Sequence, residues 1–417
     1  MIAALRFILI AFLLFAGYSR TASAATTFVD KHVTAIPEAS LLNGSPRSLL
    51  DDHRQQVSLH FTALTRPLFF VWAFSMIGAS LYLWMSGRAA KLRDFLKRRI
   101  RTPAVVRFAY GVLLAGIVGA AGLPVAFIRY RIAVVYELAS QPPQSWLRDQ
   151  LLTIGLDAIL SGLVVAFVLT LVARTNLWFY YTAAGIVCFS FAVNYIEPVL
   201  IAPLYNTYRA LPESNPLASR LRDLERRAGL EGVPIFIDDQ SKQTAVVNAN
   251  VAGYGAMRRI VLGDNLLAET TPGEALFITA HEMGHSVRND VFRLTLFGTC
   301  LLLVTASFAV VIADRVAFRR DDDPLSRLAL VTALLGTIGL VMFPAFNGYS
   351  RVIEARADAF GLALSGEHAS AVRAFVRFAD EGLAPYCPPR LVRAYFYDHP
   401  PIGSRIAAVL GKPDPCP

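Results

Sequence analysis

The segment His281-Glu282-Met283-Gly284-His285 has the residue types and spacing of an HExxH motif. Residues four apart share one face of a helix, so both imidazoles can reach one metal ion. Glu282 lies beside that face, where its carboxylate can take a proton from a metal-bound water. Because short motifs also occur by chance, the alternative is a helix whose histidines contact only water or a lipid headgroup.

A catalytic zinc ion needs a third protein ligand and an open position for water. Glu354 and Asp358 are again four residues apart, and Glu354 can complete a His/His/Glu ligand set. Asp358 is then expected to accept a hydrogen bond from a ligand imidazole, which fixes the tautomer of that ring. Alone, this pair is better explained by a surface salt bridge with Arg351 or Arg356. Beside an intact HExxH motif, it predicts a site for one Zn²⁺ per chain.

The residues before His281 predict a defined start of its helix. Thr271 is a suitable N-cap, Pro272 suits the first turn, and Glu274 follows Thr271 by three residues, as in a capping box. A surface helix is expected over residues 216–229, and short strands over residues 233–238, 246–251 and 259–262. The motif is therefore expected on a helix beside a small β-sheet.

The composition is that of an integral membrane protein. Of the 417 residues, 55% are hydrophobic and only 17% are charged, and the mean hydropathy is +0.46. Soluble chains carry about 25% charged residues. The net charge of +9 could indicate nucleic-acid binding, but the basic residues occur in short runs beside apolar segments, as in cytoplasmic membrane loops. We therefore expect a lipid bilayer, and no nucleic acid, as a partner.

Six apolar segments are long enough to cross a bilayer. They cover residues 67–85, 108–128, 151–173, 177–196, 292–313 and 328–346. Four glycines in the second segment indicate close helix packing: Gly111, Gly116, Gly119 and Gly122. An earlier apolar stretch, residues 7–18, is too short to span and is followed by Ala22-Ser23-Ala24, so residues 1–24 are predicted to be a signal peptide, with an uncleaved first helix as the alternative.

The short loops predict the orientation of the chain. The loop between the first two spans has Asp94 as its one acidic residue against eight basic ones, namely Arg88, Lys91, Arg93, Lys97, Arg98, Arg99, Arg101 and Arg107. The positive-inside rule places this loop in the cytoplasm. The opposite side then receives an N-terminal segment (25–66), a zinc protease domain (207–291) and the rest of that domain (347–417), while residues 67–206 and 292–346 contain the spans.

These motifs resemble those of the integral-membrane zinc endopeptidases typified by the type I CAAX prenyl protease. Glu197-Pro-Val-Leu-Ile-Ala-Pro-Leu-Tyr-Asn206 is similar to the family segment that precedes the catalytic domain. Val247-Asn-Ala-Asn250 and Arg259-Ile-Val-Leu-Gly-Asp-Asn-Leu-Leu267 resemble two further family segments. HExxH, ExxxD and the late Asp398-His399-Pro400-Pro401 with Arg405 follow in the family's order.

The resemblance implies a fold that is mainly α, a polytopic membrane helix bundle with an α+β zincin-like catalytic domain. It implies hydrolysis of a peptide bond with Glu282 as general base and acid. It also implies that the zinc ligands are His281, His285 and Glu354, that His399 and Arg405 face the cleft and stabilise the oxyanion or hold the substrate backbone, and that Asn248 and Ala249 lie on the strand that pairs with substrate.

Two positions depart from the family pattern. Asp398 replaces a serine and Asn250 replaces an aromatic residue, which affects the expected substrate preference more than the chemistry. Eukaryotic members place the catalytic domain toward the cytosol, whereas the loop charges here predict the periplasmic side of a bacterial inner membrane. The expected substrate is a membrane-associated or exported peptide or protein.

Two other classes of function remain open from the sequence. Asp157 and Glu197 lie in or at the end of spans, as ionisable groups of a transporter do, and a catalytically inactive scaffold or chaperone would use the same bundle. Cys387 and Cys416 share the exposed tail, so a disulfide is possible there, but the sequence does not give their separation.

Overall fold

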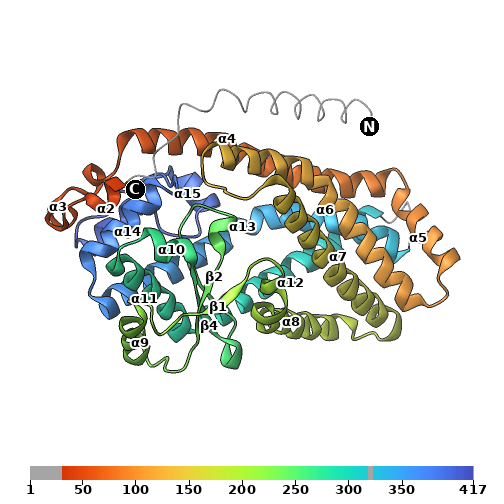
Figure 1. Cartoon of the computed structure of the whole chain (residues 1–417). Helices are drawn as coiled ribbons and strands as arrows, with labels where there is room; N and C mark the ends of the chain where they lie inside the picture. The colour runs from red at the N-terminus through yellow and green to blue at the C-terminus, as the bar shows by residue number, and fades with distance from the viewer. Residues whose placement is uncertain (1–30, 318–322, 417) are drawn as a thin grey trace.

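Figure 1 shows the chain as a computed structural model, which describes residues 31–317 and 323–416. Long helices run along the molecule, and the strands and most short helices gather at the end away from α5 (Arg88–Arg99). The signal peptide expected over residues 1–24 lies outside the described residues.

Six helices in the described part of the chain are long and apolar enough to cross a membrane. They correspond to the six predicted spans. Five helices extend beyond their predicted limits, whereas α8 matches its predicted span within one residue. Their bounds are α4 (Asp52–Met85), α6 (Pro103–Val135), α7 (Pro143–Arg174), α8 (Trp178–Ile196, continued by a π-turn, Glu197–Ile201, and a 3₁₀ turn, Ala202–Leu204), α12 (Asp290–Ala317) and α13 (Pro324–Ser365). The protein is therefore a mainly α, multi-pass membrane protein.

Glycines bring three of these helices close together. A Cβ atom on Gly111 of α6 would lie 2.9 Å from the Cα of Gly162 in α7. One on Gly122 would lie 2.7 Å from the indole nitrogen of Trp72 in α4. Larger residues would force the helices apart at both positions. Gly116, by contrast, has nothing within 4 Å and is not a packing residue.

The remaining helices are short and lie mostly in the water-exposed part. They are α2 (Lys31–Ala35), α3 (Glu38–Asn43), α9 (Ala218–Arg227), α10 (Asp264–Glu269), α11 (Pro272–Arg288), α14 (His368–Asp380), α15 (Arg390–Phe396) and α16 (Ile402–Val409), with 3₁₀ turns at Pro46–Leu49, Gln240–Lys242 and Gly255–Met257. The surface helix expected over residues 216–229 is α9, with shorter limits.

The sheet has four strands in the order β1-β2-β4-β3. The strands are β1 (Tyr208–Ala210), β2 (Ile235–Asp238), β3 (Ala249–Ala252) and β4 (Arg259–Gly263). The β2 and β4 strands are parallel, whereas β1 and β3 pair antiparallel as the two edges. Three strands match the predicted ones. The three-residue β1 was not predicted, because it is too short for a periodic pattern.

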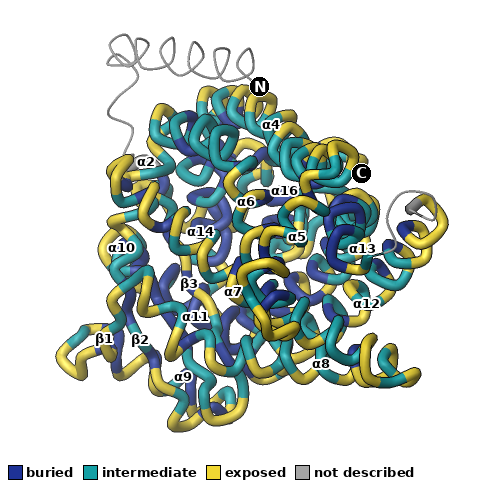
Figure 2. The backbone as a smooth tube through the Cα atoms, turned by 90° about the vertical axis from the view of Figure 1, so that its right-hand side faces the viewer, coloured by how far each residue is buried: buried dark blue, intermediate teal, exposed yellow. Residues whose placement is uncertain are grey.

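The largest core lies in the water-exposed part, around α11. Phe277 of α11 and Phe375 of α14 are fully buried and meet edge to face, with ring centroids 5.4 Å apart. Ile260 and Leu262 of β4 join the same cluster from the sheet. In Figure 2 the buried residues concentrate here, while α7 and α8 are mostly intermediate or exposed, as expected for helices that face lipid.

The two ends of the bundle collect the segments that the predicted orientation assigns to each side. At one end, Lys97 of α5 forms an ion pair of 2.6 Å with Asp323, which precedes α13. At the other end, the loop before α7 contacts the part that contains the sheet and α11, where Ser140 donates its backbone N–H to the carbonyl of Gln243 at 3.2 Å. The C-terminal tail lies at this second end and contains a disulfide between Cys387 and Cys416, with Cα atoms 5.1 Å apart.

Candidate metal centre

Helix α11 has a capped and anchored start. Thr271 accepts from the backbone N–H of Glu274 at 3.3 Å, and Glu274 accepts from that of Thr271 at 2.8 Å, which confirms the predicted capping box. The Glu274 carboxylate also accepts a hydrogen bond of 2.8 Å from Arg377 of α14, and both side chains are buried. A buried charge pair with these additional hydrogen bonds tolerates the loss of neither partner. The cap and the pair thus hold α11 in one position and rotation.

Two glycines allow α11 to lie directly against α13. A Cβ on Gly361 of α13 would lie 2.8 Å from the backbone nitrogen of His281. A Cβ on Gly284 of α11 would meet the Phe360 ring at 3.1 Å. The close approach brings Glu354, which is on α13, to the histidines of α11. Helix α13 is continuous from Pro324 to Ser365, so one helix contains both a membrane span and this glutamate.

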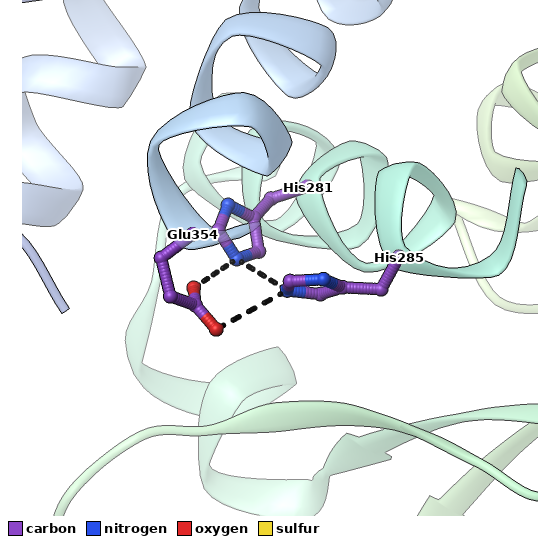
Figure 3. A group of neighbouring side chains, drawn as sticks. All are labelled: His281, His285 and Glu354. Atoms are coloured by element: carbon purple, nitrogen blue, oxygen red, sulfur yellow. Dashed lines mark hydrogen bonds and ion pairs between the residues drawn. The ribbon is translucent and has the colours of Figure 1, made fainter. Parts of the chain in front are cut away.

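His281, His285 and Glu354 converge on one point, as Figure 3 shows. The two Nε2 atoms are 3.1 Å apart. The glutamate oxygens lie 3.2 Å from His281 Nε2 and 3.5 Å from His285 Nε2. Ligands about 2.0–2.2 Å from a tetrahedral zinc ion lie about 3.3–3.6 Å from one another. The observed separations of 3.1–3.5 Å lie at or just below this range, so small side-chain shifts would bring the two imidazoles and one glutamate oxygen to three corners of a zinc coordination tetrahedron.

Two carboxylates orient the histidines toward this point. Asp358 Oδ1 lies 2.9 Å from Nδ1 of His281, and Asp290 Oδ2 lies 3.0 Å from Nδ1 of His285. The hydrogen bond between Nδ1 of His285 and Asp290, and the proximity of Asp358 to Nδ1 of His281, favour the tautomers whose Nε2 lone pairs face Glu354. Lone pairs and a carboxylate converging in a buried position repel one another unless a cation lies between them. The donor set thus fits a metal ion.

Asp290 was not identified by the sequence analysis. It is buried, and it follows Asn289, whose left-handed backbone (φ 54°) ends α11 and turns the chain into α12. This turn returns the carboxylate to His285, five residues earlier. The only signal in the sequence is an Asn-Asp pair shortly after the motif, which is typical of many helix ends.

The surrounding charges change the acid–base properties of the α11 residues. Burial alone would lower the pKa of His285, but contacts with Asp290 and Glu354 outweigh it and raise this pKa to about 10. The metal-free site therefore holds a proton that a metal ion must replace. Burial raises the pKa of Glu282, against the opposing effect of the two histidines. A raised carboxyl pKa brings a general base closer to neutral pH.

His399 lies at the exposed side of the centre, between α15 and α16. Its Nε2 is 3.0 Å from Glu354 Oε2, its Nδ1 is 2.8 Å from Asp398, and 44% of its side chain is exposed. Burial of the ring lowers its pKa, but these two carboxylates outweigh that effect and raise the pKa to about 9. The aspartate that replaces the family serine therefore supports a charged imidazole.

Arg405 and the β3 residues occupy different surroundings. Arg405 is buried, and its Nε and Nη2 donate to Asp358 at 2.8 and 2.6 Å. Ala249 begins the edge strand β3, and the carbonyl of Asn248 accepts from Gly263 of β4 at 3.0 Å. The outer edge of β3 has no partner strand within the described sheet. The substrate-binding roles of these residues stay predictions.

Two family models match consecutive parts of the chain. Residues 51–207 match the CAAX prenyl protease N-terminal model, described as five membrane helices, and residues 213–412 match peptidase family M48. The first match covers the helices before the sheet. The second contains His281, His285 and Glu354, together with the spans of α12 and α13 that lie between them in the chain.

Several known proteins are similar over long stretches. A metalloprotease of Bacillus subtilis described as uncharacterized, YhfN, is 28% identical over 383 residues, which cover 89% of each chain. A CAAX prenyl protease 1 homolog of Arabidopsis thaliana is 28% identical over 276 residues, 64% of each chain. The crystal structure of S. mikatae Ste24p has the same fold, with a TM-score of 0.74 and 20% identity over 91% of this chain and 94% of that one.

These matches favour the protease over the transporter and the inactive scaffold considered above. The order of the two family models agrees with the order of spans, HExxH helix and third glutamate along this chain. The chain therefore belongs to peptidase family M48 and is a membrane metalloprotease of the CAAX prenyl protease type.

Proposed function

We propose that this protein is a zinc endopeptidase that cleaves membrane-associated or exported polypeptides on the periplasmic side of a bacterial inner membrane. The observation that carries the proposal is the convergence of His281, His285 and Glu354 within 4.8 Å, with a carboxylate behind each imidazole. This arrangement favours one Zn²⁺ with an open fourth position.

In the proposed mechanism, His281, His285 and Glu354 would hold a zinc ion, which would supply a Lewis acid for the scissile carbonyl and for the attacking water. Glu282 removes a proton from the water and passes it to the leaving amine. The burial that raises the Glu282 pKa supports both steps, because the carboxyl must accept a proton and then release it. No covalent intermediate with the enzyme is expected.

His399 is proposed to stabilise the oxyanion. Its partly exposed ring and raised pKa make it a charged donor beside Glu354. Charged donors placed where negative charge develops contribute strongly to catalysis. Arg405 is assigned a different role from the one expected: through Asp358 it orients His281 and is a positioning residue.

The free edge of β3 is the proposed binding site for an extended substrate backbone. Ala249 lies on this strand and Asn248 directly precedes it, and an unpaired strand edge offers a row of N–H and C=O groups to a peptide. Substrate added here would form a fifth strand of the sheet. Ala249 is buried, whereas Asn250 is exposed and can contact substrate side chains.

The proposed orientation rests on two independent features. The basic loop around α5 favours the cytoplasm, and the catalytic part lies at the other end of the bundle. The Cys387–Cys416 disulfide in the tail is typical of an oxidising compartment such as the periplasm.

The test compares the wild type with Glu282→Gln. We expect about one zinc per chain in both proteins by elemental mass spectrometry, and cleavage of a quenched peptide library by the wild type alone. Zinc-free wild type that cleaves no peptide would contradict the proposal. Because relatives are named prenyl proteases, a farnesylated peptide and its unmodified form are included. Comparison of membrane and secreted proteins with and without Glu282 then identifies the substrates.

A further inference from the structure

The α5 end of the bundle, which lies away from α11 (Figure 1), borders a cavity. A cavity of about 510 Å³ opens there between four helix ends: the last residues of α5 and α7, and the first residues of α6 and α13. It is lined by Lys97, Ile100, Arg101, Pro103, Val106, Arg107, Leu169, Val172, Ala173, Asp323, Pro324 and Leu325. Neither the metal chemistry nor the proposed substrate path uses this cavity.

The cavity has an excess of positive charge. Asp323, its one acidic residue, pairs with Lys97 at 2.6 Å and lies 3.7 Å from Arg93. Arg107 donates to the hydroxyl of Thr170 at 2.9 Å, and this contact holds its guanidinium at the cavity. Neither Arg101 nor Arg107 pairs with a carboxylate anywhere in residues 31–317 or 323–416. Within the described residues, two guanidinium charges are thus left for an anion.

The rest of the wall is apolar and belongs to membrane-spanning helices. Leu169 and Val172 are in the last turns of α7, and Val106 is in the first turn of α6. Charged and apolar lining therefore meet where the spans end, at the level of lipid headgroups. A phosphate ion would contact only the charged part and would leave most of the volume unfilled. A phospholipid would fill both parts.

We propose that this cavity binds an anionic phospholipid, with the phosphate at Arg101 and Arg107 and the acyl chains along α6 and α7. Guanidinium groups suit phosphate because they donate two parallel hydrogen bonds. Basic pockets between spans on the cytoplasmic side are a known setting for acidic lipid headgroups. The lipid would connect α5, α6, α7 and α13, and α13 also supplies Glu354.

The experiment measures lipid binding by the full-length protein with Arg101→Gln and Arg107→Gln combined. Native mass spectrometry and competition with a fluorescent lipid compare dioleoyl phosphatidylglycerol with dioleoyl phosphatidylcholine. We expect the wild type to prefer the anionic lipid and the variant to bind it about 30-fold more weakly, because each basic residue contributes about 1 kcal/mol near an anionic surface.

Two control variants distinguish a site from general surface charge. Lys91→Gln with Arg98→Gln removes the same charge from exposed positions of α5 that do not line the cavity, and should leave binding within about twofold. Arg101→Lys with Arg107→Lys retains the charge and should bind more tightly than the glutamine pair, which separates loss of charge from misfolding.

Three results would overturn the proposal. One is equal binding of the two lipids by the wild type. Another is an equal loss in the cavity variant and the α5 control, which would indicate surface charge alone. The third is displacement of the lipid by millimolar inorganic phosphate, which would identify a soluble anion as the ligand. Peptide cleavage is measured separately, so failure here leaves the protease assignment intact.

Discussion

The guanidinium of Arg405 donates two hydrogen bonds to Asp358, and the same carboxylate lies 2.9 Å from Nδ1 of His281. Arg405 also lies over the Phe375 ring, 4.2 Å from its centroid. The guanidinium of Arg405 is therefore held between the Phe375 ring on one side and the Asp358 carboxylate on the other. Arg405, near the C-terminus, thus fixes the carboxylate beside His281, a proposed ligand more than a hundred residues earlier.

Arg405→Gln should lower the metal affinity by about 10- to 100-fold, the range typical of partners behind a ligand. Competition with a zinc chelator measures this change. Arg390→Gln, which removes an exposed charge at the start of α15, is the control and should leave the affinity unchanged. An unchanged affinity in Arg405→Gln would show that Asp358 orients His281 without help.

Asp290→Ala should weaken metal binding to a similar degree, because His285 then loses the carboxylate 3.0 Å from its Nδ1. Asp290→Asn retains an acceptor oxygen and should lose less than the alanine variant. The same chelator titration ranks the three proteins. Equal metal affinities of the wild type and the alanine variant would show that Asp290 does not support metal binding.

Gly361→Ala should displace α13 from α11, since a Cβ at this position would lie 2.8 Å from the His281 backbone. Overpacking of this kind costs about 1–3 kcal/mol. We expect a lower melting temperature and weaker zinc binding. Gly339→Ala, on the same helix with nothing within 4 Å, is the matched control. Equal melting temperatures and zinc affinities of the two variants would show that the contact between α11 and α13 accommodates an added methyl group.

The metal-free protein should lose stability as the pH rises from about 7 to about 10. His285 has a folded-state pKa of about 10, above its unfolded value of about 6.5. Its contribution is complete below the unfolded value and disappears as the pH passes the folded one. Zinc needs the neutral ring, so its binding strengthens over the same range.

Melting curves at pH 7 and pH 9.5, with chelator and with zinc, measure both effects. The difference between the two curves should widen at the higher pH. A metal-free melting temperature that rises with pH would contradict the assignment of a proton to His285.

Thiol labelling tests the disulfide and the side of the membrane together. The protein is denatured under conditions that prevent thiol–disulfide exchange and is then treated with a maleimide. If the tail is periplasmic, Cys387 and Cys416 should react only after reduction. Cys188 and Cys300 are free and should react without reduction, so they serve as internal standards. Four labels before reduction would favour a cytoplasmic tail.

The sequence predicted the features that depend on local spacing. The cap at Thr271, the two histidines of α11 and the six spans all follow from residues close together in the chain. Predicting that Glu354 lies beside these histidines required combining two motifs, HExxH and ExxxD, that lie on different helices. The contacts behind the ligands were harder to predict, because Asp290 reaches His285 only through the left-handed turn at Asn289.

Arg405 illustrates a second limit of sequence reasoning. The motif around His399 indicated that Arg405 belongs near the site. The direction of its guanidinium depends on Phe375 and Asp358, which lie on other helices. The strand β1 and the continuous course of α13 were likewise not predictable, since one is too short for a pattern and the other joins two regions of different composition.

The course of α13 has a consequence for how this enzyme can exist in a cell. His281 and His285 precede α12, while Glu354 is in the same helix as the following span, so the chain crosses the bilayer twice between the proposed ligands. No single proteolytic cut can shed a water-soluble fragment that contains all three. With these three residues as the metal ligands, activity is expected to stay confined to the membrane surface, and a secreted fragment that lacks one of them is expected to be inert.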